Sequence, residues 1–204
     1  MDLYFSPLAC SMASRIVLYE TGADADFHRV DLAAGRLADG GDYRAVNPKG
    51  LVPALRLDDG EVLTENPAIL QYLADRDPQA GLAPAGFARY RLQQWLSFVG
   101  SELHKTVFSP LISRAADAAA KARAREQAAE RFAYLDAHLA GRDWLLDRFS
   151  VADAYLAVVL NWAPLVKFDL DAYPHVIAYR DRAHARPSIA RALEEERALY
   201  GQPA

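Results

Sequence analysis

The chain contains a single cysteine, Cys10, directly before a stretch whose sequence favours a helix. If that helix begins at Ser11, its unpaired backbone N–H groups and the positive end of its dipole would stabilise a thiolate at Cys10. A lone cysteine is also commonly a small buried hydrophobic residue, and the spacing leaves both readings open. Because no second cysteine completes a CxxC pair, any redox role would need a small-molecule thiol.

A proline follows Val52 inside a predicted strand that begins at Leu51. Proline in an apparently central strand indicates an edge, a bulge or a cis peptide bond. A cis bond at Pro53 would turn the N–H and C=O of Val52 outward, where an extended peptide ligand can pair with them. The alternative is a strand that simply starts at Pro53.

The segment Thr64-Glu65-Asn66-Pro67 predicts the start of a helix, with Asn66 as the N-cap and Pro67 in the first helical position. The N–H groups of such a terminus attract a carboxylate, and Glu65 could hold an ammonium group. Together they would suit an amino-acid zwitterion. The alternative is that Glu65 only complements the helix dipole.

Ser97, Ser101 and His104 follow an i, i+4, i+7 spacing, which places them on one face of an α-helix. His104 could donate a hydrogen bond to a thiolate or carboxylate near neutral pH. The alternative is a solvated face with a satisfied histidine. By contrast, Ser150-Val151-Ala152-Asp153 is typical of an N-capping box, to which we assign a folding role and no chemistry.

The composition excludes several classes of function. The net charge of −4 and the lack of a dense Lys/Arg cluster argue against nucleic-acid binding. No run of 18 apolar residues predicts a membrane helix, and the N-terminus lacks the positive region of a secretory signal. Neither the cysteine count nor the histidine spacing suggests a metal site. A lone thiol is consistent with a reducing cytoplasm.

These candidate residues require elements to position them, and the first part of the chain alternates strand and helix signals. Asp59-Gly60 between two apolar runs predicts a hairpin. The order β-α-β-α-β-β-α predicts a small mixed sheet with one antiparallel edge. The predicted strands span residues 3–5, 27–32, 51–57 and 61–64, and the predicted helices span 11–20 and a segment from 66 onward.

A stretch rich in Pro and Gly predicts a domain boundary, followed by helices only. We therefore expect an α/β domain at residues 1–78, a linker at 79–86 and an all-helical domain at 87–204. The helices are predicted at about 87–109, 116–140, 151–167, 174–185 and 188–199.

Four stretches together resemble bacterial glutathione S-transferases, specifically the beta class with a cysteine near the N-terminus. They are LYFSPLACSMASRIVLYETG, DYRAVNPKGLVPALRLDDGEVLTENPAILQYLAD, RYRLQQWLSFVGSELHK and FSVADAYLAVVLNWA, and they cover nearly the whole chain in the family's order. The resemblance implies a thioredoxin-like N-terminal domain, an all-helical C-terminal domain with the second-substrate pocket, and a homodimer.

The resemblance also implies roles for particular residues. Cys10 would lie beside the glutathione sulfur, with Ser11 as a second donor and His104 reaching it from the helical domain. The backbone near Leu51, Val52 and a cis Pro53 would bind the cysteinyl part, and Glu65 and Asn66 would hold the γ-glutamyl end. Gly35 stands where the family often has a lysine that contacts the glycine carboxylate, so either the neighbouring Arg36 substitutes for it or that contact is lost. Residues matching Ser97 and Ser101 often help across the dimer interface.

The expected function is therefore an enzyme that conjugates the glutathione thiolate to apolar electrophiles, with glutathione as co-substrate and no cofactor. Two alternatives stay open. One is a glutathione-dependent thiol–disulfide reductase or peroxidase in which Cys10 attacks. The other is a noncatalytic carrier of glutathione or apolar ligands. The sequence leaves open whether Cys10 forms a mixed disulfide with glutathione or only hydrogen-bonds it.

Overall fold

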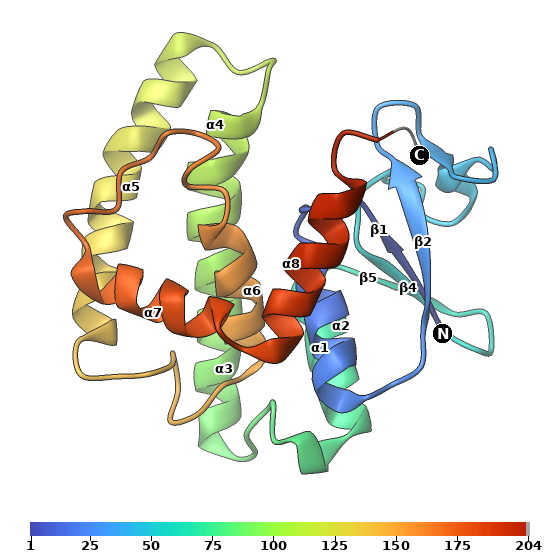
Figure 1. The fold of residues 1–204 in the computed structure, drawn as a ribbon, viewed down its shortest axis with the longest axis horizontal. Helices are drawn as coiled ribbons and strands as arrows, with labels where there is room; N and C mark the ends of the chain where they lie inside the picture. The colour runs from blue at the N-terminus through green and yellow to red at the C-terminus, as the bar shows by residue number, and fades with distance from the viewer. Residues whose placement is uncertain (203–204) are drawn as a thin grey trace. The chain divides into compact units, whose positions relative to one another are not determined.

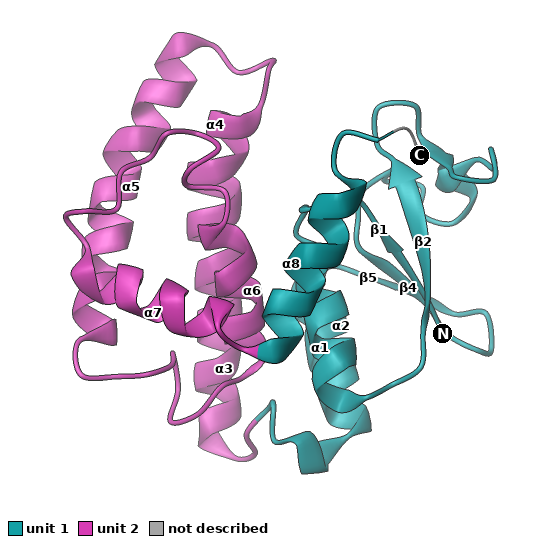
Figure 2. Cartoon of the chain, viewed as in Figure 1, with its two compact units in different colours: residues 1–83, 187–204 teal, residues 84–186 magenta. Residues whose placement is uncertain are grey.

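The structure, a computed structural model, describes residues 1–202, and these form two compact units. Within the described residues, unit 1 comprises residues 1–83 and 187–202, and unit 2 comprises residues 84–186 (Figure 2). The predicted linker at 79–86 contains the change from one unit to the other. The sequence places the last helix in the helical domain, which is predicted to end at residue 204. In the structure this helix belongs to unit 1, together with the sheet.

Unit 1 is built on a five-stranded sheet in the order β3-β2-β1-β4-β5. Strand β1 pairs with β2 in parallel, while the β1–β4, β4–β5 and β2–β3 pairs are antiparallel. This mixed sheet confirms the predicted fold class. The helix expected between the second strand and the hairpin is reduced to a single 3-10 turn, η1 (Tyr43–Ala45). The strands are β1 (Asp2–Phe5), β2 (Asp26–Asp31), β3 (Arg36–Leu37), β4 (Ala54–Arg56) and β5 (Val62–Thr64).

Unit 1 contains three α-helices: α1 (Met12–Thr21), α2 (Asn66–Arg76) and α8 (Pro187–Leu199). A short 3-10 turn, η2 (Pro78–Ala80), follows α2. Helix α1 lies beside both α2 and α8 (Figure 1). Apolar side chains spaced along one face of α8, such as Ile189, Ala192 and Leu193, are buried. That amphipathic face explains why α8 joins unit 1, because burying it against α1 removes apolar surface from water.

Unit 2 is helical. Helix α3 (Phe87–Ser97) continues into a π-helix, η3 (Phe98–Phe108), and then into α4 (Ser109–Ile112). The remaining helices are α5 (Ala118–Leu139), α6 (Val151–Leu160) and α7 (Pro174–His184). Every residue of α6 is buried, so this helix forms the centre of the unit.

The predicted capping box at the start of α6 is confirmed. The Asp153 carboxylate accepts the Ser150 backbone N–H at 2.9 Å and the Ser150 hydroxyl at 2.8 Å. Helix α6 ends at Leu160 rather than continuing to 167, because residues 161–167 form turns. Across the described residues, no helix has the length and apolar character needed to cross a membrane.

Candidate active site

Cys10 lies in the turn that leads into α1. Its thiol donates a hydrogen bond to the Val52 carbonyl oxygen at 3.3 Å, and its own carbonyl accepts from the Asn66 side chain at 2.7 Å. A thiol that donates to a carbonyl is in its neutral form, and the negative end of the carbonyl dipole opposes a thiolate at the same place. The geometry therefore favours Cys10 as a hydrogen-bonding group over Cys10 as an attacking sulfur.

Ser11 does not have the position expected of a second donor to the ligand. The residue is fully buried, and its hydroxyl donates to the Ser6 carbonyl at 3.3 Å while accepting the Ser6 N–H at 3.2 Å. Both contacts stay within the turn that carries Cys10. In this structure the Ser11 hydroxyl therefore holds the turn, and its role as a second donor to a ligand stays a prediction.

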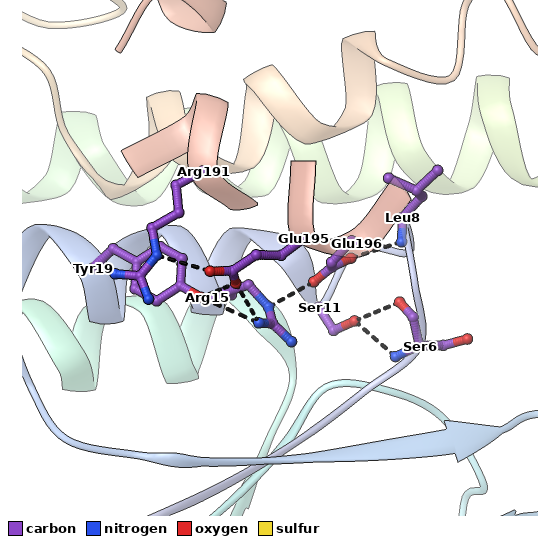
Figure 3. A network of polar contacts seen from close by, with 8 residues as sticks. All are labelled: Ser6, Leu8, Ser11, Arg15, Tyr19, Arg191, Glu195 and Glu196. Atoms are coloured by element: carbon purple, nitrogen blue, oxygen red, sulfur yellow. Dashed lines mark hydrogen bonds and ion pairs between the residues drawn. The ribbon is translucent and has the colours of Figure 1, made fainter. Parts of the chain in front are cut away.

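Helix α8, near the C-terminus, contacts the turn that carries Cys10 (Figure 3). The Leu8 N–H donates to Glu196 at 2.7 Å, with Leu8 in the left-handed region at φ 59°. Glu196 is fully buried and pairs with Arg15 Nε at 2.9 Å. Burial raises the pKa of Glu196 to about 7, although Arg15 and the Leu8 N–H act in the opposite direction.

The Val52-Pro53 peptide bond is cis, which confirms one of the two readings of the sequence. The preceding Leu51 carbonyl accepts from the Tyr43 hydroxyl at 2.8 Å and from the Asn47 side chain at 2.7 Å. Within residues 1–202 the Val52 N–H forms no hydrogen bond. The backbone at Val52 is thus fixed in place and retains an unused donor for a ligand.

Tyr43 and Asn47 are functional supports that the sequence analysis missed. Both are buried, and burial raises the pKa of Tyr43 to about 12. For Asn47 a local signal was available in the sequence. It opens the turn Asn47-Pro48-Lys49-Gly50 directly before Leu51, and asparagine is typical of turns because its side-chain amide hydrogen-bonds nearby backbone groups.

The start of α2 differs by one residue from the prediction. Glu65 is the N-cap, at φ 71°, and Asn66 is the first helical residue. The Asn66 side chain is buried because it bridges two groups, donating to the Cys10 carbonyl and accepting the Ser14 hydroxyl at 3.1 Å. Asn66 therefore positions the Cys10 turn with its side chain and has only its backbone left for a ligand.

Glu65 is exposed, and its carboxylate does not cap the helix. It pairs instead with the ammonium group of Lys49, which also donates to the Thr64 hydroxyl at 3.1 Å. Lys49 was not among the predicted site residues. Glu65 thus already holds an ammonium group, the chemistry expected of it for a zwitterionic ligand.

Gly35 directly precedes the edge strand β3, and Arg36 is the first residue of that strand. Gly35 has φ 67°, a conformation that suits glycine and would strain the lysine usual in the family. The exposed Arg36 guanidinium donates to the Gly40 carbonyl at 2.8 Å. The cation is therefore directed to its own loop in this structure.

His104, Ser97 and Ser101 belong to unit 2, where the π-helix changes their predicted relationship. A π-helix bonds i to i+5, so a turn takes more residues than an α-turn and the i, i+4, i+7 spacing no longer defines one face. Ser97 and Ser101 are exposed, and the Ser101 hydroxyl donates to the Ser97 carbonyl at 2.8 Å. His104 is partly buried instead, with Nδ1 2.7 Å from the Tyr155 hydroxyl.

The electrostatics of His104 are set by its surroundings. Burial, with a smaller contribution from Lys105, lowers its pKa to about 4, so the imidazole is neutral at physiological pH. A neutral imidazole still carries one N–H and can donate a hydrogen bond. Among the described residues there is no cluster of three His, Cys, Asp or Glu side chains that could hold a metal ion.

Comparison with known proteins shows the family of the chain. Residues 9–76 match the family described as glutathione S-transferase, N-terminal domain, and residues 99–187 match glutathione S-transferase, C-terminal domain. Glutathione S-transferase GstA of Escherichia coli O157:H7 is 44% identical over 199 residues, which cover 96% of this chain and 98% of that protein.

Two solved structures extend the similarity to the fold. A sphingomonad glutathione S-transferase complexed with glutathione has a TM-score of 0.92 at 51% identity, covering 96% of this chain and 98% of the other. The bacterial beta-class enzyme of Sphingomonas chungbukensis has a TM-score of 0.92 at 47% identity, with the same coverage of both chains. The chain belongs to the glutathione S-transferase family and is similar to its bacterial beta-class members.

Proposed function

We propose that this protein conjugates the thiolate of glutathione to apolar electrophiles. The observation that carries the proposal is the meeting of the Cys10 thiol with the Val52 backbone, whose N–H is unused. A thiol-containing peptide could pair its main chain with Val52 and so bring its sulfur beside Cys10. Because Ala54 is opposite Thr64 in the β4–β5 pair, Glu65 and the start of α2 follow close by for the ligand's amino-acid end.

The remaining predicted residues have the following places in this proposal. Glu65 would exchange Lys49 for the α-ammonium of glutathione, and the backbone N–H of Asn66 would donate to its α-carboxylate. Arg36 would leave the Gly40 carbonyl and bind the glycine carboxylate, next to Gly35. His104 would donate to the sulfur, and Ser97 and Ser101 would contribute from the partner subunit of a homodimer.

The proposed reaction requires a stabilised thiolate. Hydrogen bonds from the Cys10 thiol and His104 would favour the anionic sulfur and lower the pKa of bound glutathione. The sulfur lone pair then forms a C–S bond to the electrophile, and either a leaving group departs with its electron pair or a double bond accepts the pair and is protonated. The thiol proton goes to solvent when the thiolate forms.

The wider context is part of the same proposal. The helical unit at residues 84–186 would supply the apolar second pocket, with Trp162 and Phe168 as candidates for its lining. A cytoplasmic homodimer acting in detoxification fits a reducing compartment that holds glutathione and a lone cysteine. Sedimentation at micromolar concentration tests the dimer, and a monomer would remove the proposed role of Ser97 and Ser101.

The rival function is thiol–disulfide reduction with Cys10 as the attacking sulfur, and Cys10→Ala separates the two. Loss of one donor to the thiolate should lower conjugation to an aromatic electrophile about tenfold, or about 1.4 kcal/mol. If reduction of glutathionyl mixed disulfides is substantial in the wild type and vanishes in the variant while conjugation is unchanged, the reductase function is correct and ours is wrong.

A noncatalytic carrier is the remaining candidate. It predicts that the wild-type protein is retained on immobilised glutathione but turns over no member of a panel of aromatic, epoxide and unsaturated-carbonyl electrophiles. Conjugation of any of them at a rate above the solution reaction excludes the carrier.

The hydrogen bond from Cys10 to Val52 favours conjugation over the reductase, since it uses the thiol as a donor.

A further inference from the structure

His104 is the histidine that the proposed function uses, and a second residue controls how it can act. Its Nδ1 lies 2.7 Å from the hydroxyl of Tyr155. Tyr155 is buried in α6, with 3% of its surface exposed, and its ring stands almost perpendicular to the imidazole at 89°. The Trp162 ring packs against the imidazole with centroids 4.9 Å apart. The imidazole is therefore held on two sides.

The contact between Nδ1 and the hydroxyl decides the proton position on the whole ring. A neutral imidazole has one donor nitrogen and one acceptor nitrogen, so fixing the role of Nδ1 fixes that of Nε2. A phenol hydroxyl is a stronger hydrogen-bond donor than a neutral imidazole N–H, and an imidazole nitrogen is a stronger acceptor than a phenol oxygen. The favoured arrangement is Tyr155 donating to Nδ1.

We propose that Tyr155 is a positioning residue that holds His104 in the neutral tautomer protonated on Nε2. Nε2 makes no hydrogen bond with any residue in the described part of the chain, so its N–H is available to a ligand. In the opposite tautomer Nε2 would present a lone pair, which repels an anionic sulfur. This inference rests on the proposed function only for the identity of that sulfur; the tautomer itself does not depend on it.

The tautomer can be measured directly on the whole protein without ligand. Long-range proton–nitrogen correlation spectra of protein labelled with 15N in its histidines distinguish a protonated from an unprotonated ring nitrogen. His104→Gln assigns the signal of His104 among the five histidines. We expect Nε2 protonated and Nδ1 unprotonated at pH 7. A proton on Nδ1 would overturn the proposal, whatever the activity.

Tyr155→Phe tests the consequence, because it removes one oxygen from a buried ring. The variant should show a mixture of the two tautomers at His104, a kcat for conjugation reduced about tenfold and a KM for glutathione within about twofold of the wild type. Tyr134→Phe is the matched control on α5, where the side chain is half exposed, and should change neither spectrum nor kcat.

The outcomes separate the inference from the proposed function. If Tyr155→Phe keeps a pure Nε2–H tautomer, Tyr155 is not what holds the ring, and the proposal fails. If the variant does not fold, the wild-type spectrum still decides the tautomer. If wild-type His104 has the expected tautomer but the protein conjugates glutathione to no electrophile, the proposed function fails while the assignment of Tyr155 and His104 stands.

Discussion

At the scale of single residues, several side chains that touch the candidate site act through the backbone. Asn66 and Ser11 are buried, and each directs its polar group at the turn that carries Cys10. Tyr43 and Asn47 do the same for Leu51. Cys10 and Glu65, whose side chains contact Val52 and Lys49, are therefore set on a frame whose own polar groups are already paired.

Glu65 gives the clearest test at this scale. Its carboxylate already pairs with the Lys49 ammonium at the surface, and we expect the α-ammonium of glutathione to take that place. Glu65→Gln keeps the shape but removes the charge, so the KM for glutathione should rise about tenfold or more, with a smaller change in kcat. Steady-state rates with glutathione varied at fixed electrophile measure both.

Glu61→Gln is the control for that experiment, because Glu61 is an exposed carboxylate in the same hairpin. It should leave the KM for glutathione unchanged. An equal rise in KM for both variants would mean that the effect is a general loss of negative charge. An unchanged KM in Glu65→Gln would remove Glu65 from the ammonium site.

At the scale of elements, the sequence predicted those parts of the fold that have a local cause. The hairpin at Asp59-Gly60 and the box at Ser150 to Asp153 follow from a few neighbouring residues, and both are present. The start of α2 was one residue off, because the Asn66 side chain finds better partners in Cys10 and Ser14 than in its own helix. That preference depends on tertiary contact, which local patterns do not contain.

Two further differences have the same origin. A π-helix at residues 98–108 has no local signature separate from an α-helix, so Ser97, Ser101 and His104 were assigned to one face. Ser11 has the right type and place for a donor, yet the turn closes over it. Cys10, Val52-Pro53 and Glu65 could be singled out from sequence because their chemistry depends on their own residue type and on the neighbouring one.

The contact between α8 and the Cys10 turn predicts a large effect from one carboxylate. Glu196→Ala removes the carboxylate that pairs with the buried Arg15 Nε and accepts the Leu8 N–H. The free energy of unfolding should fall by about 3 kcal/mol, as for other buried pairs that lose one member. Urea unfolding at pH 7 measures it. Arg15 keeps its contact with Glu195, so the protein should still fold.

Two companion variants show whether the lost acceptor is the cause. Glu196→Gln retains an oxygen that can accept from Leu8 or Arg15, so its effect should be smaller than that of alanine. Glu194→Ala changes an exposed carboxylate of the same helix and should cost less than about 0.5 kcal/mol. A Glu194→Ala effect equal to that of Glu196→Ala would contradict the assignment.

The capping box of α6 predicts a pH dependence of stability. Burial raises the pKa of Asp153 from an ordinary 3.8 to about 6, although contacts with Leu145, Ser150 and Tyr179 act against it. Between those values the native state holds a proton that the unfolded state has lost. This contribution to stability is complete below about pH 4 and is lost as the pH rises through about 6.

Asp153→Asn isolates that contribution, since the amide does not titrate. The unfolding free energy of the wild type minus that of the variant should decrease by about 3 kcal/mol between pH 4 and pH 7, measured by urea unfolding. Asp147→Asn, at an exposed site, should follow the wild type at every pH. An increase in the difference over the same range would show that contacts with the ionised carboxylate outweigh its burial.

At the scale of the whole molecule, the chain order and the units do not coincide. Both ends of the chain contribute to unit 1, and the intervening residues 84–186 form unit 2 (Figure 2). A linear reading of the sequence assigned the last helix to the helical half because it follows other helices. Its partner is α1, which it meets through apolar contacts and through the buried Arg15–Glu196 pair.

Hydrogen exchange can test this division with a matched pair of buried substitutions. Ile189 in α8 and Val176 in α7 are each fully buried, and their truncation to alanine should cost about 2 and 1 kcal/mol respectively. Local opening raises exchange in the elements that pack together. Ile189→Ala should therefore raise exchange mainly in α1, and Val176→Ala mainly in α5 and α6, which contact α7.

Mass spectrometry of peptides from the exchanged protein resolves these segments. If Ile189→Ala raises exchange in α5 and α6 while α1 keeps its protection, α8 is part of the helical domain and the division of the molecule is wrong. With the expected pattern, α8 stabilises the sheet domain that carries Cys10. Changes in α8 would then alter glutathione binding through the Leu8 contact, although its residues lie far from Cys10 in the sequence.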